Sequence, residues 1–195
     1  MQATVARQAI AVGESSSARV LLAAIGVIGF AALTALGAAV RIPLPFTPVP
    51  MTLQTLFVLL AGITLGARLG AASMAFYLLL GTAGCHVFAG GEGWGLRTVF
   101  GATGGYLLGF VVAQPLLGLL ARRHGGSRRA LLLSTLAGTM VVYVCGVSWL
   151  AFWLHVGWSD ALELGLYPFL AGEALKAMAA IGLGHLIVQR TRRWR

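Results

Sequence analysis

Charged side chains are scarce in this sequence. Only 10% of its 195 residues are charged and 58% are hydrophobic, with a mean hydropathy of +0.88. A soluble domain typically carries about 25% charged residues, so this chain has too few to cover a surface that faces water. The composition excludes an ordinary soluble protein and indicates an integral membrane protein.

Lysine and cysteine are also rare. Lys176 is the single lysine among fourteen basic residues, and it follows Leu175. A phosphate-binding G-x-x-x-x-G-K-[ST] loop needs a Gly-Lys pair, so this ATP-binding motif is absent. The two cysteines, Cys85 and Cys145, belong to no C-x-x-C or Cys/His cluster, and the four histidines are scattered. We therefore predict neither a disulfide framework nor a metal site.

Hydrophobic residues form six runs separated by proline, glycine or charge. The runs cover residues of about 20–40, 53–67, 69–86, 98–120, 131–155 and 167–189. Since a spanning helix needs about 20 apolar residues, the sequence predicts an all-α polytopic membrane protein, a compact bundle of six transmembrane helices. It forms a single integral membrane domain over 1–195. The polar segment 1–18 is expected to be a disordered cytoplasmic tail.

The second and third runs are short and meet at residues 66–70. This junction is either a tight hairpin at the membrane surface or a kink within one long segment. The hairpin is favoured, because a joined segment of about 32 residues would exceed a bilayer core of about 30 Å even when tilted.

The arginines indicate the orientation of the bundle. With six spans, every arginine except Arg41 and Arg97 falls on the same side of the membrane. This asymmetry predicts that both termini are cytoplasmic and that the protein is a multi-pass protein of the cell inner (plasma) membrane. The net charge of +9 lies between apolar runs rather than on a soluble face, so no nucleic-acid partner is expected.

Two outer loops have opposite characters. Residues 41–50 contain four prolines, which favour a stiff extended path and exclude a helix. Residues 90–95 are rich in glycine, which lets a backbone approach another group closely. Both patterns are compatible with ordinary loops, but on one face of the membrane they also suit the cover of a pocket.

Glu173 and Lys176 are the residues that most need a chemical explanation. They lie three apart on one face of the last predicted helix, below the outer surface. A charge at this depth costs a few kcal/mol unless it is paired or hydrated. One interpretation of these two residues is a structural ion pair. The other is a carboxylate and an ammonium group that bind a polar ligand. Gln54, Arg97 and Tyr106 fall at a similar depth, and Phe88 suits an aromatic wall.

The first predicted helix carries small residues at four-residue spacing, Ala31, Ala35 and Ala39. Such a stripe allows a second helix to pack closely. The second helix belongs either to the same chain or to a partner protein.

Four blocks resemble the BioY family, the biotin-binding S components of energy-coupling-factor (ECF) vitamin transporters. The blocks are the proline-rich 42–55, the loop 87–91, the glycine-rich 103–110 and the segment 168–176. They cover most of the chain in the family's order. The family usually has Asp where Glu173 stands, and Pro at the positions of His86 and Ala102. Glu173 keeps the carboxylate and reaches one methylene further.

The resemblance implies a substrate-binding subunit for biotin uptake, with an outward-facing pocket that the first loop closes. The implied substrate-binding residues are Glu173, Lys176, Arg97, Gln54, Thr47, Tyr106 and Phe88. The implied partners are biotin, a transmembrane T component that docks on the alanine stripe, and ABC-type ATPases, in addition to the lipid bilayer. ATP is used only by those subunits, so we expect no cofactor and no enzymatic activity in this chain. A homo-oligomer, an S component for another vitamin and a small intramembrane enzyme acting through Ser148 or His155 remain as alternatives.

Overall fold

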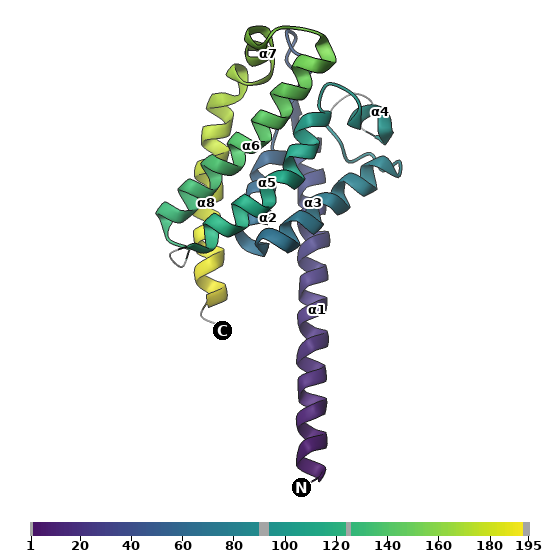
Figure 1. The fold of residues 1–195 in the computed structure, drawn as a ribbon, viewed down its shortest axis with the longest axis vertical. Helices are drawn as coiled ribbons and strands as arrows, with labels where there is room; N and C mark the ends of the chain where they lie inside the picture. Colours follow the sequence, from purple (N-terminus) through teal and green to yellow (C-terminus); the bar gives the residue numbers. More distant parts are fainter. Residues whose placement is uncertain (1, 90–93, 124–125, 193–195) are drawn as a thin grey trace.

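The computed structural model describes residues 2–89, 94–123 and 126–192. This part of the chain is mostly helical (Figure 1). Four of its helical segments are long and apolar enough to cross a membrane. They are Ser17–Ala39, Gly104–Arg122, Arg128–Leu154 and Trp158–Arg190.

The first helix, α1 (Gln2–Ala39), is longer than the sequence predicts. It includes residues 2–18, so the expected disordered tail is corrected to a helix. Alanine recurs through residues 2–11 and is the strongest helix former, which favours the extension. In Figure 1 the purple N-terminal half of α1 projects far beyond the other helices. Large apolar side chains such as Leu22, Ile25 and Leu36 are exposed along α1, as on a surface that faces lipid.

A sharp corner separates α2 (Gln54–Leu65) from α3 (Ala67–Thr82), so they are two helices and not one kinked segment. Gly66, between them, has φ +83° and ψ −179°, a conformation open almost only to glycine. Arg122 donates from Nη2 to the Leu65 carbonyl at 3.2 Å and so satisfies a free carbonyl at the end of α2. The helices have 12 and 16 residues, about 18 and 24 Å at 1.5 Å per residue, each short of a full span.

The predicted run 98–120 is divided in the structure. A short helix, α4 (Gly95–Val99), precedes the long α5 (Gly104–Arg122), because the chain turns at residues 100–103. The run 131–155 corresponds to α6 (Arg128–Leu154). The run 167–189 corresponds to the 3₁₀ turn η2 (Tyr167–Phe169) and α8 (Leu170–Arg192), and the helix before it, α7 (Trp158–Gly165), was not predicted.

The helices pack around α5, which contacts α6 as well as α2 and α3, while α8 contacts α2 and α6. Figure 1 shows α7 at one end of the bundle and both chain ends directed toward the other. The start of α2 is tied to α1, because the Leu53 amide donates to the Gly37 carbonyl at 3.1 Å. The first turn of α2 also faces the start of α8, because the Thr55 hydroxyl donates to the Glu173 carboxylate at 2.8 Å.

Candidate ligand-binding site

An ion pair lies at the beginning of α8. The turn η2 contains Pro168, whose fixed φ suits the entry to a helix, and α8 follows directly. Glu173 and Lys176 then share a face and form an ion pair. The two residues are only 5% and 8% exposed. The two charges are therefore held together inside the bundle.

The partners of this pair come from the start of α2. The Lys176 ammonium donates to the Thr52 carbonyl at 2.9 Å, and the Thr55 hydroxyl donates to Oε1 of Glu173 at 2.8 Å. Oε1 also accepts from Lys176, whereas the buried Oε2 accepts no hydrogen bond of full geometry from the described residues, although the Tyr143 side chain lies beside the carboxylate. The ion pair thus leaves one carboxylate oxygen able to accept a hydrogen bond.

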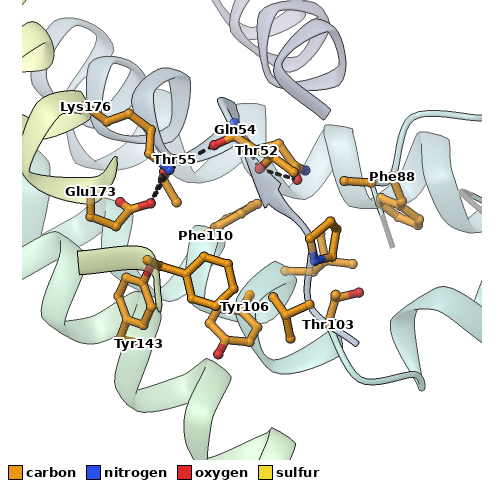
Figure 2. A pocket seen from close by; sticks show the side chains of 15 residues that line it. Thr52, Gln54, Thr55, Phe88, Thr103, Tyr106, Phe110, Tyr143, Glu173 and Lys176 are labelled. Carbon is orange, nitrogen blue, oxygen red and sulfur yellow. Dashed lines mark hydrogen bonds and ion pairs between the residues drawn. The ribbon is translucent and has the colours of Figure 1, made fainter. Parts of the chain in front are cut away.

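This carboxylate faces a cavity of about 50 Å³ between α2, α5, α6 and α8 (Figure 2). The proline-rich loop covers it with Val49 and Pro50, and aromatic rings form much of its wall. Its lining comprises Val49, Pro50, Thr52, Gln54, Thr55, Phe88, Ala89, Thr103, Tyr106, Leu107, Phe110, Tyr143, Phe169, Glu173 and Lys176. Ligand pockets typically hold about 300–1,000 Å³, so the loop or the side chains must move to admit a vitamin-sized molecule.

Five of the seven predicted binding residues meet at this cavity. They are Glu173, Lys176, Gln54, Tyr106 and Phe88. The Tyr106 hydroxyl donates to the Gly165 carbonyl at 2.7 Å, so its ring and not its hydroxyl is offered to the cavity. Phe88 packs against Gly81, where a Cβ would collide with its ring, and meets Tyr77 edge-on at 5.5 Å.

Thr47 does not line this cavity, and its hydroxyl holds the proline-rich loop in place instead. Its hydroxyl donates to the Leu164 carbonyl at 2.7 Å and accepts from the Val49 amide at 3.2 Å. Its side chain is therefore committed to the protein, which differs from the binding role that the sequence predicts for it.

The proline-rich loop is fastened at its base as well. Strands β1 (Arg41–Ile42) and β2 (Met51–Thr52) pair in antiparallel register and bring its two ends together. Arg41 donates to the Ala89 carbonyl at 3.1 Å and so joins the loop to the segment that precedes the glycine-rich stretch. Residues 90–93 of that stretch lie outside the described residues, but the loop and residues 88–89 do cover the same cavity.

Arg97 is on α4 and does not line the cavity. It lines a neighbouring hollow with Pro48 and Trp153, and Thr103 lines both spaces. Arg97 therefore lies next to the cavity, near the proline-rich loop, and not inside the cavity.

Sequence reasoning missed several residues of the site. Thr55, Tyr143 and Tyr77 contact or surround the predicted residues, but each lies in an apolar run without a charge to mark it. Phe88 is expected as an aromatic wall, but only the fold shows that Phe110 and Tyr143 converge with it at the cavity.

The alanine stripe of α1 is divided between two surroundings. Ala31 is fully buried in the bundle, Ala35 is half-buried and Ala39 is exposed. Ala31 therefore packs within the chain, while Ala35 and Ala39 lie nearer the surface of α1.

Apolar helices of membrane-spanning length around a cavity with a buried ion pair define a polytopic membrane protein. The family model of the BioY family matches residues 10–193. The chain belongs to the BioY family.

Individual proteins agree with this assignment. The "Probable biotin transporter BioY" of Pyrococcus horikoshii is 40% identical over 152 residues, 78% of this chain and 87% of that protein. The "Biotin transporter BioY" of Thermotoga maritima is 39% identical over 165 residues, 83% and 95% of the two chains. The crystal structure at 2.1 Å of "the S-component for biotin from an ECF-type ABC transporter" matches with a TM-score of 0.78 and 26% identity, over 90% of this chain and 93% of that one.

Proposed function

We propose that this chain is the biotin-binding S component of an ECF-type transporter and captures biotin from the outer side of the membrane. The observation that carries the proposal is the buried Oε2 of Glu173, an acceptor without a hydrogen bond of full geometry in the described structure, beside Lys176 in an aromatic cavity. Relatives named as biotin transporters support the choice of ligand.

The chemistry of biotin suits the residues present. Its ureido ring offers two N–H donors and one carbonyl oxygen, which complement the free oxygen of Glu173 and the ammonium of Lys176. The apolar fused rings fit against Tyr106, Phe110 and Tyr143. The valerate tail then extends past Thr103 toward Arg97, whose guanidinium group suits a carboxylate.

The proposal includes a membrane arrangement and partners. The domain 1–195 is a single membrane domain with six spans, in which α2 and α3 form a short pair, and both termini are cytoplasmic. A T component docks on the surface of α1 that includes Ala35 and Ala39, and ABC-type ATPases bind to that component. The chain itself performs transport without chemical change of its ligand and without a cofactor, and the ATPases alone use ATP.

Equilibrium binding on the purified full chain in lipid nanodiscs tests the proposal. Labelled biotin is expected to bind saturably and to be displaced by unlabelled biotin, but not by thiamine, riboflavin or lipoate. Saturable binding of one of those vitamins, measured with the labelled vitamin, together with no binding of biotin would assign an S component of another specificity. Absence of binding to all of them would reject the proposal.

The enzyme alternative receives no support from its proposed residues. The Ser148 hydroxyl donates to the Val144 carbonyl of its own helix at 2.5 Å. His155 ends α6 in a left-handed conformation with φ 57°, seven positions further along the chain. Neither residue lines the cavity that holds the ion pair, although Ser148 lines an adjoining apolar hollow that Glu173 also borders.

A further inference from the structure

Tyr77 of α3 binds a residue of the cavity without lining the cavity itself. Its side chain is fully buried, with 0% exposure. Its hydroxyl oxygen lies 2.6 Å from Nε2 of Gln54 and 2.7 Å from the carbonyl oxygen of Val87. Gln54 is a wall residue, and Val87 begins the outer segment that carries Phe88.

The proton of this hydroxyl can go to only one of the two neighbours. A carbonyl oxygen cannot donate, so Tyr77 must donate to Val87. Its oxygen then faces Gln54 as an acceptor, and the end of the Gln54 side chain beside it must be the NH₂ group. Tyr77 therefore fixes the orientation of the Gln54 side-chain amide.

The other end of the amide agrees with this assignment. The Thr52 hydroxyl donates to Oε1 of the Gln54 side chain at 3.1 Å and accepts from the main-chain N–H of Gln54 at 3.3 Å. The Thr52 carbonyl in turn accepts from Lys176, so Thr52 connects Gln54 with the ion pair (Figure 2). A carbonyl oxygen has two lone pairs, and Oε1 can accept a second hydrogen bond.

We propose that Tyr77 is a positioning residue that directs the Gln54 carbonyl oxygen, and not its NH₂ group, toward a bound ligand. Together with Oε2 of Glu173, the site then offers acceptors to a ligand with N–H donors. The inference rests on the proposed function and specifies which groups of the ligand the α2 wall recognises. Tyr77 then contributes to ligand specificity through Gln54, without lining the cavity itself.

The position of Tyr77 also depends on the outer segment. Val87, the acceptor of its proton, precedes Phe88 and Ala89, and Arg41 holds the Ala89 carbonyl. Phe88 meets the Tyr77 ring edge-on. The cover of the cavity and the orientation of Gln54 are thus joined through one hydroxyl group.

A double-mutant cycle measured with labelled biotin on the full chain tests the inference. Tyr77→Phe keeps the ring and is expected to weaken biotin binding about five- to ten-fold, the effect of losing one buried neutral hydrogen bond. Gln54→Leu is expected to weaken it further. In the Gln54→Leu background, Tyr77→Phe should have a clearly smaller effect than in the unmodified chain, because only its hydrogen bond to Val87 is then left to lose.

Tyr106→Phe is the matched control for this cycle. Its hydroxyl is also buried and donates to a carbonyl, that of Gly165, without touching Gln54. Its effect should multiply with that of Gln54→Leu. If the effects of Tyr77→Phe and Gln54→Leu multiply in the same way, Tyr77 has only a structural role and the inference is rejected.

A second measurement needs no substitution. Biotin methylated on one ureido nitrogen lacks a donor, and the unmodified protein is expected to bind it more than about ten-fold more weakly than biotin. Equal binding of the two would overturn the inferred orientation of Gln54 while leaving biotin binding itself established. Failure to bind biotin at all would instead reject the proposed function.

Discussion

At the scale of single residues, the two oxygens of Glu173 have different surroundings. Oε1 accepts from Lys176 and Thr55, whereas Oε2 is buried and accepts no hydrogen bond of full geometry in the described structure. An ammonium group has three donors, and Lys176 directs two of them to Glu173 and Thr52. A purely structural ion pair gains nothing from an unsatisfied buried oxygen, whose desolvation costs about 1–3 kcal/mol.

Replacement of the ammonium tests this interpretation. We expect Lys176→Ala to weaken biotin binding about 100-fold or more, because the variant loses a donor to the ligand and leaves Glu173 buried and unpaired. Equilibrium binding of labelled biotin to the purified protein measures the loss.

Arg190→Ala is the matched control, since Arg190 is an exposed cation near the other end of the same helix. It should bind biotin normally, and both variants should reach the membrane. Unchanged binding by Lys176→Ala would contradict the assignment of the site to this ion pair.

The success of sequence reasoning at this scale depended on charge. Glu173 and Lys176 stand out in the sequence because charges in an apolar helix are costly and rare, and the structure places both at one cavity. Their role in binding stays a prediction. Tyr77 gave no such signal, since its hydroxyl finds its partners on α2 and on the segment after α3. Thr47 was associated with the site through its loop, but its contact with Leu164, 117 positions away, is visible only in the fold.

At the scale of elements, the proline-rich loop is a stiff cover with two fastenings. Arg41 holds its base to Ala89, and Thr47 holds its far part to Leu164. Because the cavity beneath it is small, exchange of a ligand requires these contacts to open, and each of them should slow release.

Loss of the hydrogen bond from Arg41 to the Ala89 carbonyl should therefore change the rate at which biotin is released. Arg41→Ala is expected to raise the rate of biotin release roughly ten-fold, as expected for a hydrogen bond from a charged donor. Stopped-flow displacement of a fluorescent biotin measures this rate, and Thr47→Val should accelerate it too. Arg68→Ala, which removes an exposed arginine from the start of α3, is the control. An unchanged release rate in Arg41→Ala would show that the loop does not govern exchange.

The conformation of Gly66, between α2 and α3, leads to a prediction about the stability of the protein. A Cβ on Gly66 would require a strained φ and would meet the Arg122 guanidinium group. Gly66→Ala is therefore expected to cost about 1–3 kcal/mol and to lower the thermal unfolding midpoint. Gly182→Ala, at a site in α8 where a Cβ meets nothing within 4 Å, should leave the midpoint unchanged or slightly raised. Equal midpoints for the two variants would contradict the strain at Gly66.

Long helices were easier to predict than short ones. The run 131–155 corresponds closely to α6 because a span requires an apolar length that is visible in the sequence. The helices α4 and α7 have 5 and 8 residues and carry no such signature, so the segments around them were expected to be loops. The hydrogen bond from Tyr106 to the Gly165 carbonyl is a tertiary contact that helps to hold α7.

At the scale of the whole molecule, both chain ends are directed away from the end that carries α7 (Figure 1). This arrangement agrees with an even number of crossings. The arginine distribution then predicts which end faces the cytoplasm, since all arginines except Arg41 and Arg97 lie on the side of the termini in the six-span arrangement.

Labelling of single cysteines tests the orientation. In a background with Cys85→Ala and Cys145→Ala, Ser159→Cys on α7 should react with a membrane-impermeant maleimide added outside intact cells. Gln189→Cys near the end of α8 should react only after the membrane is permeabilised. Both positions are exposed, so access to the reagent depends on the side of the membrane. The opposite pattern would reverse the predicted orientation and place the pocket toward the cytoplasm.

The fastening of the proline-rich loop has a consequence for how such proteins diverge. Both donors, Arg41 and Thr47, lie within the loop, and both acceptors are main-chain carbonyls, those of Ala89 and Leu164. Every residue type supplies a carbonyl, so neither hydrogen bond prescribes the side chain at position 89 or 164. The two fastenings of residues 41–52 therefore constrain the backbone of a relative and not its side chains at positions 89 and 164. The side chains that this segment does require elsewhere are Lys176, which donates to the Thr52 carbonyl, and Gln54, which accepts from the Thr52 hydroxyl.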